Sequence, residues 1–515
     1  MRSALVPSLA LAAALAACTV DIEGAKCNVA GATDNCPSGQ ACGTGLTCSV
    51  RAASCAPCEM GAIECRSGTI DVMKCSAASD PVCGTWTVAT ACAAGAQTCA
   101  APLAGGAPEC ACERWTVAPE AAAAACIRPS INSAISAATR FPAPVVVLGG
   151  AAFTYGNALD DSAPIIIPAG LTLIGDDATP ASATNRIIAV QGPGPEGLRV
   201  HPGAVVRGVA VQRGATASNE LTIGVLLTGG PAASGNTLVS VRVDAMGAGG
   251  GFAIGLRVAG GNVVASANTI AMSDVLVRGA TVAGLEVNRL GASDVVIVTD
   301  SVFDSNHVGV SLLKGDLALR ASTVKSSVAE GVSAVSGTGS LTIHDGIVAH
   351  SGATGIVLTA IQALSLERTR ICGNAGSDKL YGGQTRKVGG LYSQGPRPPR
   401  LAFLANRIHA NTGDQMYVVA SAATWDISGP GGVGGCATGV PNVFAGYSAP
   451  GVGLAALATN VLALNNSWEV SYPLDGVDFT ASGTCGAAAC GIDVGTGSGN
   501  VCLPAAPADL ICHLP

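Results

Sequence analysis

The feature that most constrains the fold is an internal repeat of about two dozen residues. Six segments carry apolar residues at offsets 0, 2 and 7, and their first residues lie 25, 22, 24, 23 and 37 positions apart. Because apolar residues that alternate with a period of two indicate strands, each repeat predicts two or three short strands. One such repeat cannot bury its own apolar face and must stack on the next, so the sequence predicts a parallel β-solenoid. The six segments begin at Ile270, Val295, Leu317, Leu341, Leu364 and Leu401.

Two further rows keep the same spacing. A glycine followed by alternating apolar residues recurs at Gly197, Gly224, Gly255, Gly284, Gly309, Gly331, Gly355 and Gly390. A polar turn position recurs at Ser305, Ser327, Ser351, Asn374 and Asn411. We interpret the polar row as a structural ladder, because such side chains can satisfy the backbone groups of stacked turns.

Over roughly residues 128–475 the repeat resembles the right-handed parallel β-helix of the pectate-lyase-like fold. The stretch "GGAAFTYGN" followed by "IIIPAGLTLIGDD" is similar to the first coil of that superfamily. Before it, Ser130 can cap a short helix whose Ile131, Ile135 and Ala138 share one face, as in the capping helix of that fold. A β-sandwich, the competing all-β fold, would not give such constant spacing.

The apolar run from Leu5 to Ala17 is too short to span a membrane, which takes ~20 residues. It suits a secretory signal, and its end, "LAAC", resembles the lipobox of bacterial lipoproteins. The resemblance implies cleavage before Cys18 and acylation of Cys18. The mature protein is therefore expected at the bacterial outer membrane or cell surface, held by a lipid anchor. An ordinary secretory signal, with Cys18 in a disulfide, is the alternative.

The chain has 21 cysteines, and 20 remain once Cys18 carries lipid. An even number in an exported protein indicates disulfides. Fourteen lie between Cys27 and Cys126, and the other six are Cys372, Cys436, Cys485, Cys490, Cys502 and Cys512. A zinc site is the weaker interpretation, because no histidine precedes His201 and no second CxxC accompanies that at Cys55.

These signals divide the chain into four parts. They are a signal peptide (1–17), Cys18 with small disulfide-rich modules (18–126), the parallel β-helix (127–475) and a C-terminal cap pinned by disulfides (476–515). The cap would cover the strand edges of the last coil. The fold class is thus all-β, with one short helix.

The net charge of −7 gives no indication of a nucleic-acid partner. The interval from Arg368 to Arg407 nevertheless holds eight basic residues and one acid, Asp378 (8 − 1 = +7). It also contains the longest gap between repeats, which predicts an inserted loop over 376–400 that projects from the solenoid. Loops on rigid scaffolds often carry function, and these cations could hold carboxylates or sulfates of an acidic polysaccharide. A solvated, flexible loop is an equally weighted alternative. The candidate binding residues are Arg370, Lys379, Tyr381, Arg386, Lys387, Tyr392, Arg397, Arg400 and Arg407.

Catalytic candidates are weaker. Stacking places Arg320, His344 and Glu367 at one offset, with Arg368 beside them, and a histidine between a cation and a carboxylate can act as a general acid or base. An exposed ladder of alternating charges is the favoured interpretation.

Other catalytic patterns of the fold have no match. Asp304, Ser326 and His350 share an offset like a hydrolase triad, but stacked turns imply no pocket. The motifs of polygalacturonases and pectate lyases are absent, no aspartate cluster supports a calcium site, and no cofactor or metal is predicted.

The sequence therefore predicts a surface-anchored lipoprotein that acts as a non-catalytic binding or scaffold module. An acidic polysaccharide or another envelope component is the expected partner. A polysaccharide lyase or glycoside hydrolase is the alternative, and an aromatic content of 3% argues against its sugar-stacking groove.

Overall fold

The computed structural model describes residues 61–77, 84–118, 125–149, 153–155, 164–175, 186–229, 235–244, 250–260, 269–288, 295–381 and 384–419, with gaps of one or two residues, and short segments elsewhere. The predicted signal peptide, Cys18 and most of the C-terminal cap lie outside the described residues. The chain forms two compact units, Met1–Glu113 with Arg140–Pro142 and Arg114–Thr139 with Ala143–Pro515. Among the described residues, no helix has the length and apolarity that a membrane crossing requires.

The first unit is a disulfide-stapled module, as the cysteine pattern predicts. An antiparallel sheet of β3 (Ile63–Cys65), β4 (Val72–Ala77) and β5 (Gly84–Thr90) is followed by the β6–β7 hairpin (Gln97–Ala100 and Glu109–Cys112). Disulfides join Cys65 to Cys99 and Cys92 to Cys110. A second hairpin pairs β1 (Gln40–Cys42) with β2 (Cys48–Val50).

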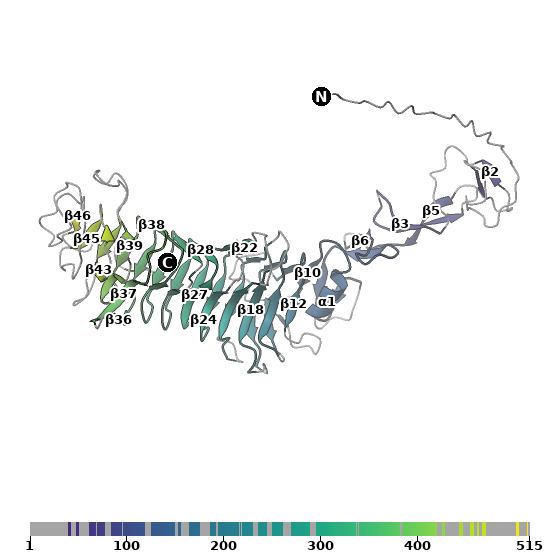
Figure 1. Cartoon of the computed structure of the whole chain (residues 1–515). Helices are drawn as coiled ribbons and strands as arrows, with labels where there is room; N and C mark the ends of the chain where they lie inside the picture. The colour runs from purple at the N-terminus through teal and green to yellow at the C-terminus, as the bar shows by residue number, and fades with distance from the viewer. Residues whose placement is uncertain are drawn as a thin grey trace, which may run out of the picture. The chain divides into compact units, whose positions relative to one another are not determined.

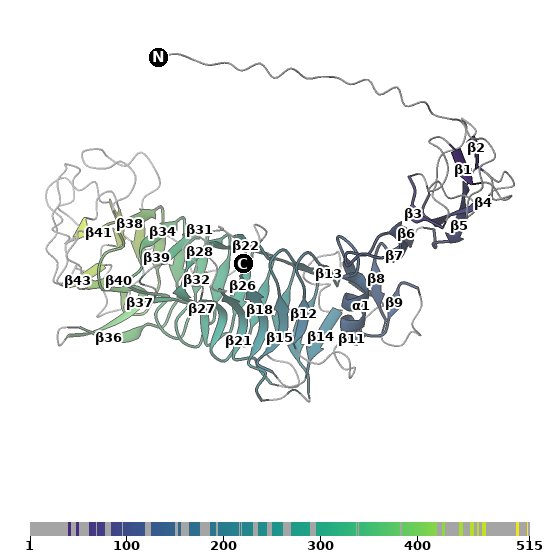
Figure 2. The ribbon, with the colours of Figure 1, turned by 45° about the vertical axis from the view of Figure 1, so that its right-hand side comes forward.

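The second unit is the predicted parallel β-helix, in which three parallel sheets run the length of the stack (Figures 1 and 2). Sheet 1 contains β8 (Trp115–Val117), β9 (Ile127–Arg128), β10 (Val145–Leu148), β13 (Thr172–Ile174), β16 (Val205–Arg207), β19 (Thr237–Val239), β22 (Thr269–Ser273), β25 (Val295–Thr299), β28 (Asp316–Arg320), β31 (Ser340–His344), β34 (Ala363–Glu367) and β38 (Arg400–Leu404).

Sheet 2 contains β11 (Phe153–Tyr155), β14 (Arg186–Val190), β17 (Ala210–Arg213), β20 (Arg242–Asp244), β23 (Leu276–Arg278), β26 (Val302–Asp304), β29 (Thr323–Lys325), β32 (Ile347–Ala349), β35 (Arg370–Cys372), β39 (Arg407–His409), β42 (Val443–Ala445), β45 (Ser467–Glu469) and β46 (Val501–Leu503).

Sheet 3 contains β12 (Ile165–Ile167), β15 (Glu196–Val200), β18 (Ile223–Thr228), β21 (Ile254–Ala259), β24 (Ala283–Asn288), β27 (Val308–Lys314), β30 (Val332–Val335), β33 (Ile356–Thr359), β37 (Gln384–Gln394), β40 (Asp414–Val419) and β43 (Leu454–Leu457), with β36 (Ser377–Tyr381) antiparallel to β37. A separate short pair joins β41 (Trp425–Asp426) and β44 (Val461–Leu462).

The predicted helix is α1 (Ile131–Ala138), capped by Ser130. The Ser130 side chain accepts a hydrogen bond from the backbone N–H of Ser133, which satisfies a donor that the first turn leaves free. Ile131, Ile135 and Ala138 are buried, as their spacing predicts.

The repeat packs in the predicted register with one exception. Ile270 pairs with Val296, not with Val295. All four residues from 295 to 298 are apolar, so either alternating set satisfies the pattern, and a slip of one residue exchanges the two faces. The structure buries Val296 and Val298.

The same slip changes one member of the polar ladder, because Asn306 takes the place predicted for Ser305. Asn306 donates to Val277 O at 3.1 Å and accepts from the Ala280 backbone N–H at 3.0 Å. Asn374 Oδ1 accepts from the Ser351 N–H at 2.9 Å in the same way. The ladder is structural, as predicted. A second buried ladder, which the sequence analysis missed, contains Thr369, Asn406, Asn442 and Asn466.

The predicted inserted loop over 376–400 is instead largely a hairpin. β36 pairs antiparallel with the first half of β37, while the second half of β37 is a regular strand of sheet 3 between β33 and β40. Arg386 forms two hydrogen bonds to the buried carboxylate of Asp414, at 2.6 and 3.1 Å, and Lys379 lies 3.7 Å from Glu330. Both acids come from other coils, which is why a count of charges within 368–407 did not reveal them.

The chain's C-terminal region returns to the solenoid through a disulfide between Cys372, at the end of β35, and Cys512. None of these three disulfides crosses between the two groups of cysteines. Two lie within the N-terminal group (Cys27–Cys126), and one lies within the group of six from Cys372 to Cys512.

Candidate functional site

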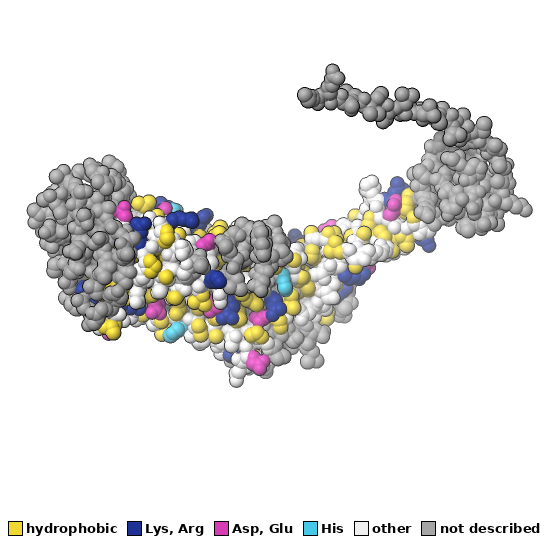
Figure 3. All heavy atoms as spheres, in the orientation of Figure 1, with side chains coloured by type: hydrophobic (Ala, Val, Ile, Leu, Met, Phe, Trp, Pro, Cys, Tyr) yellow, Lys and Arg dark blue, Asp and Glu magenta, His cyan; other side chains and the backbone are white. Residues whose placement is uncertain are grey.

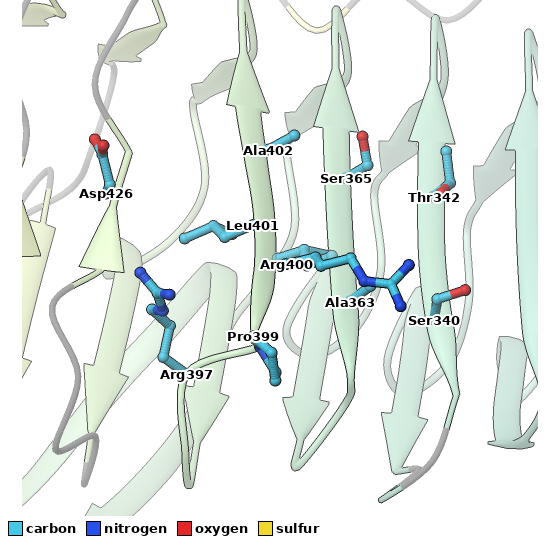
Figure 4. A pocket seen from close by; sticks show the side chains of 11 residues that line it. Ser340, Thr342, Ala363, Ser365, Arg397, Pro399, Arg400, Leu401, Ala402 and Asp426 are labelled. Atoms are coloured by element: carbon cyan, nitrogen blue, oxygen red, sulfur yellow. The ribbon is translucent and has the colours of Figure 1, made fainter. Parts of the chain in front are cut away.

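A groove of about 580 Å3 crosses the outer face of sheet 1 over three successive strands, β31, β34 and β38 (Figure 4). It is open to solvent and has no aromatic residue in its lining. The lining residues are Ser340, Thr342, Ala363, Leu364, Ser365, Arg397, Pro399, Arg400, Leu401, Ala402 and Asp426.

The floor of the groove follows from strand alternation. Thr342, Ser365 and Ala402 stand in register on adjacent strands and point outward, whereas their neighbours Leu364 and Leu366 point inward and are buried. Small side chains at three successive outward positions leave a depression, and two of them carry hydroxyl groups.

Two arginines and an aspartate also line the groove. Figure 4 shows Arg400 extending from β38 across the neighbouring strand towards Ser340, with Arg397 and Asp426 on the opposite side of Leu401. Ser340 itself donates to Asp316 Oδ1 at 2.6 Å. Within the described part of the chain, the exposed Arg400 guanidinium has no hydrogen bond or ion pair.

The predicted row of Arg320, His344 and Glu367 lies at the carboxyl ends of β28, β31 and β34, outside the lining residues of the groove. The three residues pair in register on β28, β31 and β34. His344 Nε2 lies 3.2 Å from Glu367 Oε2, and Ser365 of the floor donates to the other oxygen of Glu367 at 3.4 Å. The row is therefore connected to the groove.

Two turn residues, Asp345 and Arg368, extend this row into a cluster of charged side chains. Asp345 and Arg368 each follow a sheet 1 strand in the left-handed conformation, with φ of 54° and 47°. Arg368 donates to both oxygens of Asp345 at 2.6 and 2.9 Å, and it contacts the ring of His344, whose Nδ1 lies 2.7 Å from Asp345.

The Arg368 hydrogen bonds hold the pKa of the Asp345 carboxyl below its usual range, and the same pairing raises the pKa of Arg368. A lowered carboxyl pKa adds stability above the pKa of the unfolded chain, and this stability is lost as the pH falls through the folded value. Because Arg368 and Asp345 are 51% and 46% exposed, solvent screens the contribution. His344, Asp345, Glu367 and Arg368 thus form a partly exposed cluster of charges paired with one another.

The other predicted binding residues are distributed over the three sheets rather than gathered on one loop. Arg370 and Arg407 are neighbours on sheet 2, and Lys379, Arg386 and Lys387 belong to the hairpin of sheet 3. Only Arg397 and Arg400 line the groove. In the space-filling view, Lys and Arg side chains gather close to the position of β38 in Figure 1 (Figure 3).

Of the two tyrosines, Tyr392 does not provide the predicted stacking face. Tyr392 is only 5% exposed, because its ring packs against Tyr417 and lies under the Lys379 ammonium group. The side chain of Tyr381 lies outside the described residues.

The triad of Asp304, Ser326 and His350 does not form a row. Asp304 pairs with Lys325, so it stands one position away from the offset of Ser326 and His350, and its carboxylate accepts from Ser305. Among the residues that the structure describes, no three His, Cys, Asp or Glu side chains are grouped as a metal site would need.

Sequence reasoning missed the floor residues and Asp426. The floor residues could have been found from the strand alternation. In each sheet 1 strand, the residue between the two apolar positions points outward. Thr342, Ser365 and Ala402 occupy that position in successive repeats. Asp426 belongs to no repeat, and nothing in the sequence places it beside Arg397.

Comparisons with known proteins found similar solved structures but no similar sequence. The chain matches no protein-family model and no curated protein sequence. Among solved structures, the A-module of the mannuronan C-5 epimerase AlgE4 of Azotobacter vinelandii is similar at 13% identity and a TM-score of 0.38, over 69% of this chain and 95% of that chain. The A-module of AlgE6 from the same organism is 15% identical at a TM-score of 0.33, over 73% and 94%.

Proposed function

We propose that this protein is a non-catalytic binding module that holds an extended acidic polysaccharide in the groove across β31, β34 and β38. The observation that carries the proposal is an open groove with hydroxyl groups on its floor and an unpaired arginine, Arg400, in its lining. The Arg400 guanidinium has no ion pair or hydrogen bond among the described residues, so it is available to a ligand. With a lipid anchor at Cys18, the expected location of the groove is the cell surface.

The dimensions of the groove suit a chain rather than a single sugar. Neighbouring strands lie ~4.8 Å apart, so the three strands β31, β34 and β38 span roughly 10 Å along the solenoid. A guanidinium binds a carboxylate or sulfate through paired N–H groups. Because the lining contains no aromatic ring, binding would depend on anionic groups and hydroxyls rather than on stacking against sugar faces.

The alternative is a polysaccharide lyase or hydrolase, favoured by the contact chain from the groove floor through Ser365 and Glu367 to His344. Against it, the charges of this cluster are paired with one another and are half or one-third exposed. New reducing ends or unsaturated products, formed by the wild-type chain and lost in His344→Gln, would favour the enzyme.

Charge reversal at Arg400 tests the proposal. We expect Arg400→Glu to weaken binding of polygalacturonate by about tenfold, because repulsion replaces a charge-assisted hydrogen bond. Affinity would be measured by biolayer interferometry at constant ionic strength, with neutral dextran as the negative control.

Lys387→Glu is the matched control, because Lys387 is an exposed cation on the hairpin of sheet 3 and makes the same change in net charge. It should alter the affinity less than twofold. Equal losses in the two variants would mean that net charge, not the groove, attracts the polysaccharide.

A further inference from the structure

We infer that the groove selects a polysaccharide in which acidic sugars alternate with neutral ones, and that the Asp316 carboxylate enforces this choice. The inference rests on the proposed function, because it names the substrate class of the same site.

The lining of the groove offers one place for an anionic group. Arg400 is the lining cation that makes no ion pair or hydrogen bond within the described part of the chain. Arg397 and Asp426 lie together on the opposite side of Leu401, so that side adds charges of opposite sign. The other polar side chains of the lining carry neutral hydroxyls, and they are Ser340, Thr342 and Ser365. A ligand with an acidic group on every sugar would therefore place most of these groups away from a cation.

A fixed carboxylate adjoins the groove beside Ser340. Asp316 itself stands outside the lining, but its Oδ1 accepts from the backbone N–H of Ser340 at 2.8 Å and from the Ser340 hydroxyl at 2.6 Å. Its second oxygen, Oδ2, makes no hydrogen bond to any residue that the structure describes. The Ser340 donors are neutral, and Val295, the neighbour of Asp316 on β25, is apolar. Neither neighbour therefore neutralises the carboxylate.

The cation and the carboxylate approach Ser340 from opposite sides. Arg400, Ala363, Ser340 and Asp316 are the first residues of four successive strands, β38, β34, β31 and β28. The Arg400 side chain extends across β34 towards Ser340 (Figure 4). Arg400 and Asp316 thus present opposite charges along the same row of sheet 1.

This order of charges discriminates between sugars. Neighbouring strands lie ~4.8 Å apart, close to the advance per sugar in an extended polysaccharide, so neighbouring sugars meet the two charges in turn. Arg400 binds the carboxylate of one sugar. Asp316 repels a carboxylate on the next sugar but accepts a hydrogen bond from a hydroxyl or an acetamido N–H. Such a repulsive element gives specificity even where the attractive contact is shared.

Two hexasaccharides test the choice by biolayer interferometry with the full chain at fixed ionic strength. Hexagalacturonate is acidic at every sugar, and a hyaluronan hexasaccharide is acidic at every second sugar. We expect the wild-type chain to bind the alternating hexasaccharide more tightly by about three- to tenfold. Attraction by net charge alone would favour hexagalacturonate, which carries more anionic groups.

Asp316→Asn should remove this preference by tightening the binding of hexagalacturonate about three- to tenfold. The asparagine amide oxygen can still accept both bonds from Ser340, so the variant changes the charge and keeps the local contacts. Asp304→Asn, at the end of β26 in sheet 2, makes the same change in net charge away from the groove and should keep the preference.

The outcomes separate the choice of sugar from the proposed function. A preference for the alternating hexasaccharide that is lost in Asp316→Asn and kept in Asp304→Asn supports the inference. Equal or tighter binding of hexagalacturonate by the wild-type chain overturns it and leaves the proposed function standing, as does a preference that Asp316→Asn retains or that both variants lose. Binding of neither hexasaccharide overturns the proposed function together with the inference.

Discussion

Arg386→Met should lower the free energy of unfolding by about 3–5 kcal/mol, because it removes the guanidinium that pairs with the buried Asp414 carboxylate. Asp414 is 1% exposed and accepts two hydrogen bonds from the Arg386 guanidinium. This pair fixes the β36–β37 hairpin to β40. Urea denaturation followed by circular dichroism would measure the loss.

A double variant and a neighbour provide the controls. Arg386→Met with Asp414→Leu should recover most of the stability, because no unpaired charge remains. Lys387→Met, at the exposed next position, should change stability by less than about 0.5 kcal/mol. If Arg386→Met were as stable as Lys387→Met, the hairpin would not be anchored by this pair.

Gly331→Ala should destabilise the fold by about 2–3 kcal/mol, because the glycine row has no room for a side chain. A Cβ at Gly331 would lie 2.7 Å from the carbonyl oxygen of Gly355 in the next coil and 2.5 Å from a methyl group of Val348. Neither backbone can retreat without breaking the register of sheet 3. The midpoint of thermal unfolding would report the loss.

Gly337→Ala is the matched control in the same repeat. A Cβ at Gly337 would meet no atom within 4 Å, so that variant should keep the wild-type midpoint. Equal midpoints for the two alanine variants would show that the coils do not stack as closely as the structure has them.

The solenoid could be predicted from sequence because its determinants are local and repeated. Apolar alternation indicates the strands, the spacing indicates the stack, and Ser130 begins the helix where a cap is required. The register failed only at residues 295–298, where four consecutive apolar residues do not distinguish inside from outside. The lipid anchor at Cys18 stays a prediction.

The candidate site was less predictable because its contacts join residues from different coils. The Arg320–His344–Glu367 row was found by counting offsets, since equal offsets become neighbours in a stack. The partners of Arg386 and Lys379 are Asp414 and Glu330, which no count of charge within one interval reveals. The groove exists because small residues face outward at the same position of three successive repeats, and a single repeat does not show this.

The most direct test of the central claim is a crystal structure of the full chain with an acidic hexasaccharide. We predict sugar density along the outer face of β31, β34 and β38, with an anionic group on the Arg400 guanidinium and hydroxyls near Thr342 and Ser365. Density over sheet 2, or over the hairpin of sheet 3, with an empty groove would contradict the claim.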